Sequence, residues 1–167
     1  MIPDLIDAGQ KDLLLPVGIH QATLAEVEAA LVQTQPTYQR RVELWGLFNQ
    51  FLTLVKGYVP VDHVFLDGSF VTSRPAPKDT DVSIWVDAEG IDALTPAQQQ
   101  AFGLLWSQRM SRFHCDAYLV TPCAPAHPEH KTYLHWKNAT ETSWPAYKNR
   151  AKLIVAGVTK GYIEVMT

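Results

Sequence analysis

Two helices are predicted near the N-terminus, where apolar residues recur at spacings of three and four. Thr23 and Glu26 form a capping-box pattern, so the first helix is expected to begin at Leu24. Pro36 ends this helix, because the residue before a proline disfavours the helical conformation. The second helix is predicted over residues 37–56, and its broad apolar stripe is typical of a helix that packs against a sheet.

Strands are predicted where apolar and polar residues alternate, or where a short apolar run is bounded by Gly or Pro. This pattern indicates strands at 63–66, 80–87, 114–120 and 161–166, and a further helix at 96–110. Helices and strands mixed in this order indicate an α/β fold. We expect a mixed β-sheet with the helices packed on one face.

The whole chain is expected to form one domain, because no repeat, low-complexity segment or linker divides it. Along it we expect an extended segment at 1–22, a helical pair at 23–57, a core at 62–120 and a C-terminal extension at 121–167. Within the extension, residues 133–149 are rich in Trp, Tyr, Asn and Thr and show no clear period. No helix or strand is therefore predicted there.

Composition places the chain among ordinary globular proteins, with 47% apolar and 19% charged residues in a length of 167. A net charge of −3 gives no sign of an extended nucleic-acid groove. The two cysteines, Cys115 and Cys123, do not suggest a disulfide framework, so a reducing compartment is expected. The sequence shows neither a signal-peptide pattern nor an apolar run of transmembrane length, and we expect a cytoplasmic protein without a membrane partner.

The strongest candidate chemistry lies in the D-x-D pair formed by Asp79 and Asp81. Residues two apart in a strand point to the same face, about 7 Å apart along it. Val82 and Ile84 then take the opposite, buried face. Two neighbouring carboxylates repel each other, and a divalent cation is the simplest agent that relieves this repulsion.

Asp116 is a candidate third carboxylate. The alternation of its predicted strand places Asp116 and Tyr118 on one face, and their apolar neighbours on the other. A structural interpretation stays open, in which Asp116 is a solvated strand residue or a partner of Arg109 or Arg112.

Four sequence blocks resemble an uncharacterised family of bacterial and phage proteins within the nucleotidyltransferase superfamily, which includes DNA polymerase beta. The blocks are an L-P-x-G-x-H-x-A-T opening at 15–23, D-G-S-F-V-T at 67–72, P-x-D-x-D at 77–81 and a K-G-hydrophobic ending at 160–165. The superfamily signature is Gly-Ser followed by D-x-D on a strand. The resemblance implies a nucleotidyltransferase-like mixed sheet.

The resemblance also implies a metal-dependent enzyme that transfers a nucleoside monophosphate from a nucleoside triphosphate, ATP among the candidates, to an acceptor. The cofactor would be Mg²⁺ or Mn²⁺. Asp81 would bridge two metal ions, Asp79 would help to hold the nucleotide-bound ion, and Asp116 would hold the other and favour deprotonation of the acceptor.

Gly68 and Ser69 are candidates for binding the triphosphate, since glycine permits close backbone approach and serine offers a hydroxyl donor. The alternative is a tight structural turn. Arg74 and Lys78 could neutralise phosphate charge or be solvated loop residues. Asp67 departs from the superfamily pattern and is either a fourth acidic ligand or a turn-stabilising carboxylate.

The acceptor could be a protein, an RNA or a small molecule. By resemblance, the protein would belong to a toxin–antitoxin or phage-defence system and have a cognate protein partner. A non-catalytic nucleotide-binding or regulatory module on the same fold is the alternative. Trp136, Trp144 and Tyr147 could stack on a nucleobase or form a small second core.

Overall fold

A five-stranded mixed sheet forms the centre of the protein in a computed structural model, which describes residues 1–34, 39–148 and 154–166. Its strand order is β1-β7-β2-β3-β4. The β1–β7 and β3–β4 pairs are parallel, and β2 is antiparallel to both of its neighbours. The strands are β1 (Ile19–Thr23), β2 (His63–Asp67), β3 (Thr80–Trp85), β4 (Cys115–Val120) and β7 (Tyr162–Met166). A second, antiparallel sheet pairs β5 (Ala146–Lys148) with β6 (Ile154–Thr159).

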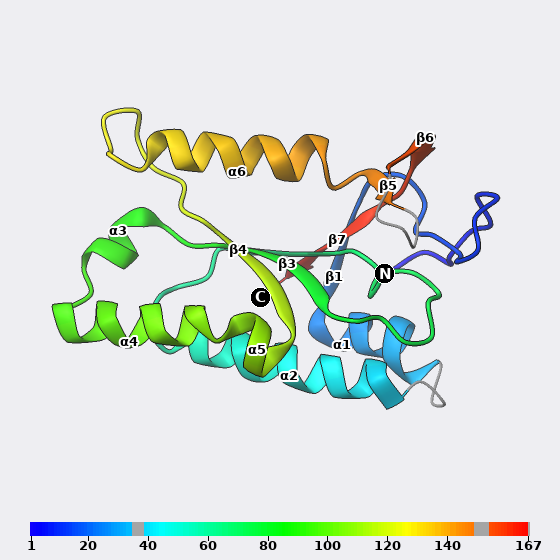
Figure 1. Ribbon diagram of the computed structural model, residues 1–167, viewed down its shortest axis with the longest axis horizontal. Helices are drawn as coiled ribbons and strands as arrows, with labels where there is room; N and C mark the ends of the chain where they lie inside the picture. The colour runs from blue at the N-terminus through cyan, green and yellow to red at the C-terminus, as the bar shows by residue number, and fades with distance from the viewer. Residues whose placement is uncertain (35–38, 149–153, 167) are drawn as a thin grey trace.

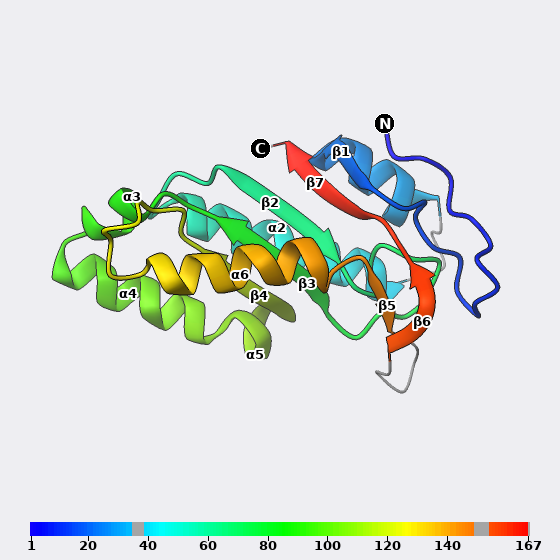
Figure 2. The same cartoon turned by 90° about the horizontal axis from the view of Figure 1, so that it is seen from above.

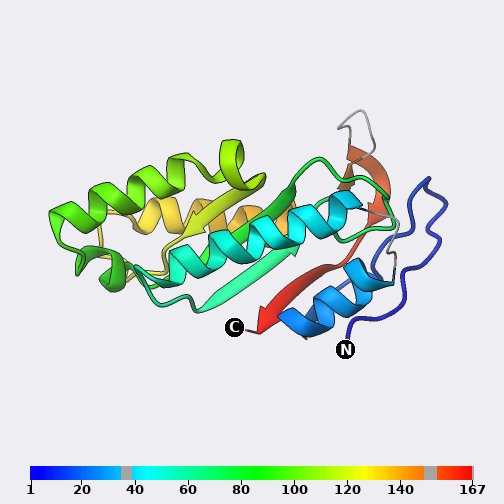
Figure 3. The same ribbon diagram turned by 90° about the horizontal axis from the view of Figure 1, so that it is seen from below.

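Most of the helices lie on one side of the five-stranded sheet (Figure 1; Figure 3). Thr23 caps the first of them through the capping box that its sequence pattern predicts, and Thr95, which the sequence indicates as an N-cap before Pro96, also forms a capping box, with Gln98. The helices of this layer are α1 (Leu24–Glu28) with its π-helical continuation (Ala29–Gln33), α2 (Gln39–Lys56), α4 (Pro96–Ser107) and α5 (Arg109–Phe113). The short helix α3 (Ala88–Asp92) lies beyond the end of the sheet (Figure 1). The predicted start of the second helix at residue 37 lies outside the described residues.

The core fills the space between the sheet and α2. Phe48 and Phe51 of α2 are fully buried, as are Val64, Val82 and Ile84 on the facing strands. Burial of such side chains contributes about 1.5–3 kcal/mol each. The apolar side of β3 is therefore turned toward α2, and its polar side faces the other way.

The prediction that the helices pack on one face is wrong for α6 (His130–Thr142). This helix covers the opposite face of the sheet, over β3 and β4 (Figure 2). Its rings contact the sheet through Tyr133 against Trp85 and Trp136 against Tyr118. Within α6 itself, Thr140 is the one buried residue. Since the helix lies over polar residues, it has no continuous apolar stripe that would reveal it in the sequence.

The C-terminal stretch is part of the central sheet, because β7 lies between β1 and β2. The segment 121–167 therefore contributes a strand that the N-terminal half requires to complete the sheet. None of the helices in the described ranges is both long enough and apolar enough to cross a bilayer.

Candidate active site

Three aspartates form a row across neighbouring strands. Asp67 lies opposite Asp81 in the β2–β3 pair, and Asp81 lies beside Asp116 in the β3–β4 pair. Adjacent strands are about 4.8 Å apart, and paired residues point to the same face. Asp79 comes one residue before β3. The strand register thus brings the D-x-D pair and Asp116 together on the face that α6 covers.

A cavity of about 490 Å³ lies between this face of the sheet and α6. All the residues named as candidates from the sequence line it: Gly68, Ser69, Arg74, Lys78, Asp79, Asp81 and Asp116. Tyr118 of β4 and Trp136 of α6 also line the cavity, with ring centroids 4.9 Å apart. Segments that are distant in the chain therefore converge on a single space.

Gly68 leaves room for the Asp81 carboxylate. Its φ of 71° is in the left-handed region, and a Cβ at this position would overlap Asp81 Oδ2. Only glycine meets both conditions without strain. The turn that follows is held by the Ser69 carbonyl, which accepts hydrogen bonds from the Thr72 amide and hydroxyl. The glycine of the Gly-Ser pair is therefore required by the position of Asp81, whether or not a phosphate approaches it.

We expect Gly68→Ala to destabilise the protein more than Gly9→Ala. Gly9 has nearly the same φ, 70°, but a Cβ added there would meet no atom within 4 Å. Both variants bear the left-handed strain of about 1–2 kcal/mol, and only Gly68→Ala adds overlap with Asp81, worth about 1–3 kcal/mol. Urea denaturation measures both. Adding Asp81→Ala to Gly68→Ala should recover most of the stability that Gly68→Ala loses beyond Gly9→Ala. If the two glycine variants lose the same free energy of unfolding, the overlap with Asp81 is contradicted.

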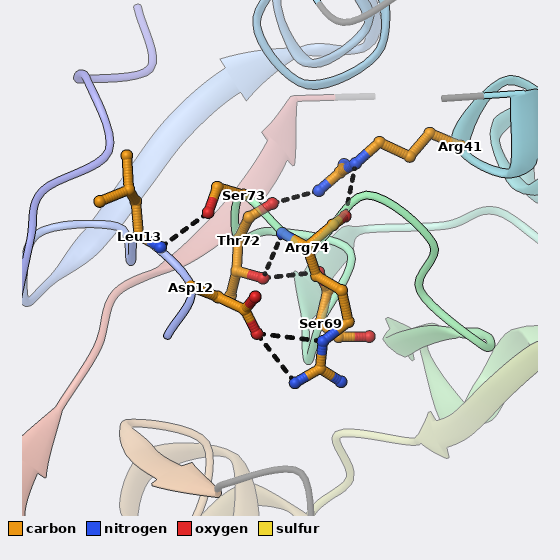
Figure 4. A network of polar contacts seen from close by, with 7 residues as sticks. All are labelled: Asp12, Leu13, Arg41, Ser69, Thr72, Ser73 and Arg74. Carbon is orange, nitrogen blue, oxygen red and sulfur yellow. Dashed lines mark hydrogen bonds and ion pairs between the residues drawn. The ribbon is translucent and has the colours of Figure 1, made fainter. Parts of the chain in front are cut away.

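Arg41 of α2 shapes the loop after the Gly-Ser turn (Figure 4). Its side chain is 1% exposed. The guanidinium donates hydrogen bonds to the carbonyls of Leu31 (3.0 Å), Phe70 (2.7 Å), Thr72 and Arg74 (3.1 Å). Buried carbonyls need such donors. The Pro-rich loop is therefore ordered by a residue of α2 rather than by a helix of its own.

The N-terminal segment holds the same loop from its other side (Figure 4). Arg74 Nε and Nη2 both donate to Asp12 Oδ2, at 3.1 and 3.0 Å. The Ser73 hydroxyl accepts from the Leu13 amide at 2.7 Å. Arg74 thus reaches the cavity as a member of an ion pair with the buried Asp12, whereas Lys78 is exposed at its edge.

Lys160 is a cavity residue that the sequence patterns did not identify as a site residue. Its ammonium forms a buried ion pair with Asp67 Oδ1. Burial lowers the pKa of Lys160 to about 7, and the adjacent carboxylate opposes that shift because it favours the charged ammonium. The sequence left Asp67 as either a fourth acidic ligand or a turn-stabilising carboxylate. In the structure its carboxylate is held by the ion pair with Lys160, directly before the Gly68 turn. No spacing in the sequence links residues 93 positions apart.

The carboxylates also act on Tyr118. Burial raises the pKa of the Tyr118 phenol, and the charges of Asp116 and Asp81 raise it further, since a phenolate beside them is disfavoured. Tyr118 is therefore a neutral hydroxyl next to both aspartates. Its pKa reports on their charge.

The donor set of this cavity fits a hard divalent cation. Asp79, Asp81 and Asp116 offer oxygen ligands, which Mg²⁺ and Mn²⁺ prefer. Among the described residues, no group of three or more His, Cys, Asp or Glu side chains is arranged to hold a metal ion by itself. Mg²⁺ at phosphate sites commonly takes only one or two carboxylates, with waters and substrate phosphates as its other ligands.

Comparison with known protein families gives a match over most of the chain. The model of a family of unknown function, DUF6932, matches residues 8–166. No curated protein and no solved structure matches the chain. The family match includes every strand and helix described above and all the residues of the carboxylate row. The chain therefore belongs to DUF6932, a family whose function is unknown.

Proposed function

We propose that this protein is a metal-dependent nucleotidyltransferase, which transfers a nucleoside monophosphate from a nucleoside triphosphate to an acceptor hydroxyl. The observation that carries the proposal is the register of β3 and β4. It sets Asp81 directly beside Asp116, in the cavity that also contains Asp79 and the Gly68 turn. Such a cluster of carboxylates in a cavity that also contains basic side chains favours phosphoryl chemistry over a purely structural role.

The charge of the cavity supports a requirement for metal. Among the lining residues that the structure describes, aspartates outnumber basic residues by one: Asp12, Asp67, Asp79, Asp81 and Asp116 against Arg74, Lys78, Lys148 and Lys160. A triphosphate entering alone would be repelled by the carboxylates. Bound Mg²⁺ or Mn²⁺ would neutralise charge on the phosphoryl oxygens and on the attacking hydroxyl. Asp79, Asp81 and Asp116 are the residues that would hold it.

The transfer itself forms one bond and breaks one. The acceptor oxygen bonds to the α-phosphorus, the bond from that phosphorus to the bridging oxygen breaks, and pyrophosphate leaves. The cavity would hold the reactants in line and exclude water beneath α6. Asp116, at the side of the row next to Tyr118, would orient the acceptor hydroxyl and favour loss of its proton. The neutral Tyr118 hydroxyl can hydrogen-bond to the acceptor.

Thermal unfolding with each of the four nucleoside triphosphates and Mg²⁺ or Mn²⁺ tests the proposal. A ligand at one hundred times its Kd stabilises the folded state by about 2.7 kcal/mol, which raises Tm by about 5–10 °C for a chain of this size. We expect the wild type to show this rise with one or more triphosphates, and Asp81→Asn to lose it. Asp62→Asn, a change on an exposed residue outside the cavity, is the control. A wild type indifferent to every metal–triphosphate pair would refute the proposal.

A further inference from the structure

The K-G pair that opens the C-terminal block is fixed by backbone hydrogen bonds, that of Gly161 being to the N-terminal block. The Lys160 amide donates to the Pro145 carbonyl at 2.8 Å, and the Gly161 amide donates to the Leu15 carbonyl at 3.1 Å. A Cβ on Gly161 would overlap the Pro16 carbonyl oxygen. The two blocks at opposite ends of the chain therefore pack on each other. Their contact sets the position from which the Lys160 side chain enters the cavity.

The Lys160 side chain is almost fully enclosed, with the residue 5% exposed. Its ammonium donates to Asp67 Oδ1, and Asp67 directly precedes the Gly68–Ser69 turn. An ammonium has three donors. Among the described residues, Asp67 is the one hydrogen-bond acceptor of Lys160 Nζ. The ammonium is thus held next to the turn with donors to offer a ligand in the cavity.

Stability alone does not explain this ion pair. Burying a lysine and a carboxylate costs desolvation free energy that their attraction often fails to recover, and apolar residues of similar volume are commonly as stable. Both Asp67 and Lys160 line the cavity. A pair that is costly to bury and borders a ligand cavity points to a role in binding.

The other basic residues that the structure describes in the cavity lining are less suited to hold an anion. Arg74 is engaged by Asp12 through two of its nitrogens. Lys78 and Lys148 are exposed, so water and salt weaken their attraction for a ligand. Lys160 is buried, where the same charge acts through a lower effective dielectric constant.

We propose that Lys160 binds the polyphosphate tail of the nucleotide, and that Asp67 holds its ammonium beside the Gly68–Ser69 turn. This inference rests on the proposed nucleotidyltransferase function and adds to it a residue outside the superfamily signature. Lys160 bonds to the phosphates beyond the α-phosphate, so it contributes to binding triphosphates and little to binding monophosphates. Upon transfer it would stabilise the charge of the departing pyrophosphate.

The test replaces the pair as a unit, because removing one partner would leave the other buried and unpaired. In Asp67→Leu/Lys160→Met both charges are absent, and we expect a folded protein. Isothermal titration then measures the Kd for the triphosphate that stabilises the wild type most, with Mg²⁺, and for the matching monophosphate. Triphosphate affinity should fall about 10- to 100-fold, the range for hydrogen bonds to charged groups. Monophosphate affinity should change less than about threefold.

Two further variants separate binding from structure. Lys78→Met removes an exposed charge of the same cavity and should weaken triphosphate binding by less than about fivefold. Asp67→Asn/Lys160→Gln replaces the pair by polar groups of similar size, and it takes the place of the apolar double variant if that variant does not fold. The expected loss of triphosphate affinity is the same. If either double variant folds and binds triphosphate as tightly as the wild type, the proposed role of Lys160 is overturned and the proposed enzymatic function is not. Absence of metal-dependent triphosphate binding in the wild type would instead overturn the proposed function.

Discussion

Asp116→Asn is expected to slow nucleotidyl transfer by orders of magnitude while leaving nucleotide binding almost unchanged. The amide keeps the shape of the side chain but loses the charge that would favour deprotonation of the acceptor. Single-turnover transfer should fall by about three orders of magnitude or more, as for loss of a group that acts mainly in the transition state. Triphosphate affinity should stay within a few-fold, because Asp79 and Asp81 remain. Transfer within a few-fold of wild type would remove Asp116 from the site.

A measurement on Tyr118 checks the geometry of Asp116 without an acceptor. The charges of Asp116 and Asp81 hold the pKa of Tyr118 up, so loss of the Asp116 charge should lower that pKa toward the ordinary value. Titration of Tyr118 by NMR, with selectively labelled tyrosine, follows the change. Asp62→Asn, outside the cavity, should leave it unaltered. If the pKa of Tyr118 is the same in Asp116→Asn as in the wild type, the proximity of Tyr118 and Asp116 is contradicted.

Asp116 also separates the two functional hypotheses. A nucleotide-binding or regulatory module on this fold would bind triphosphate with metal but form no covalent product. In that case labelled triphosphate would give no transfer in cell extract, and Asp116→Asn would change nothing but the Tyr118 titration. An enzyme shows transfer that depends on the Asp116 charge.

Arg41→Met should destabilise the protein by about 3–5 kcal/mol, the range for leaving several buried polar groups without a partner. The substitution removes the donor of four carbonyls, three of them in the loop between Phe70 and Arg74. Urea denaturation measures the loss. Hydrogen exchange should show that the Thr72 amide, bonded to the Ser69 carbonyl, loses protection.

Arg40→Met is the matched control for this prediction. Arg40 is the neighbouring arginine of α2. It forms an ion pair with Glu43 at 2.9 Å and donates one hydrogen bond to the Lys78 carbonyl at 2.6 Å, against the four carbonyls bound by Arg41. Exposed pairs of this kind contribute about 1 kcal/mol or less. Similar small losses for Arg40→Met and Arg41→Met would show that the loop does not depend on the buried guanidinium.

Local sequence signals predicted the elements whose causes lie within a few residues. The capping box at Thr23 forms as predicted, because cap and partner are three residues apart. Alternation of apolar and polar residues placed Asp116 and Tyr118 on one face of β4. Such signals failed for α6, whose inward face meets a polar cavity and so carries no apolar period.

The sequence by itself determined the helices capped by Thr23 and Thr95, the D-x-D segment and the faces of the strands that carry chemistry. Only the tertiary structure decided that Asp81 lies beside Asp116 in neighbouring strands, and that Lys160 reaches Asp67 from a position just before β7, the strand inserted between β1 and β2. Caps and alternation depend on interactions over a few residues. Strand order and register depend on which distant segments together bury the most apolar surface, a quantity that no local window contains.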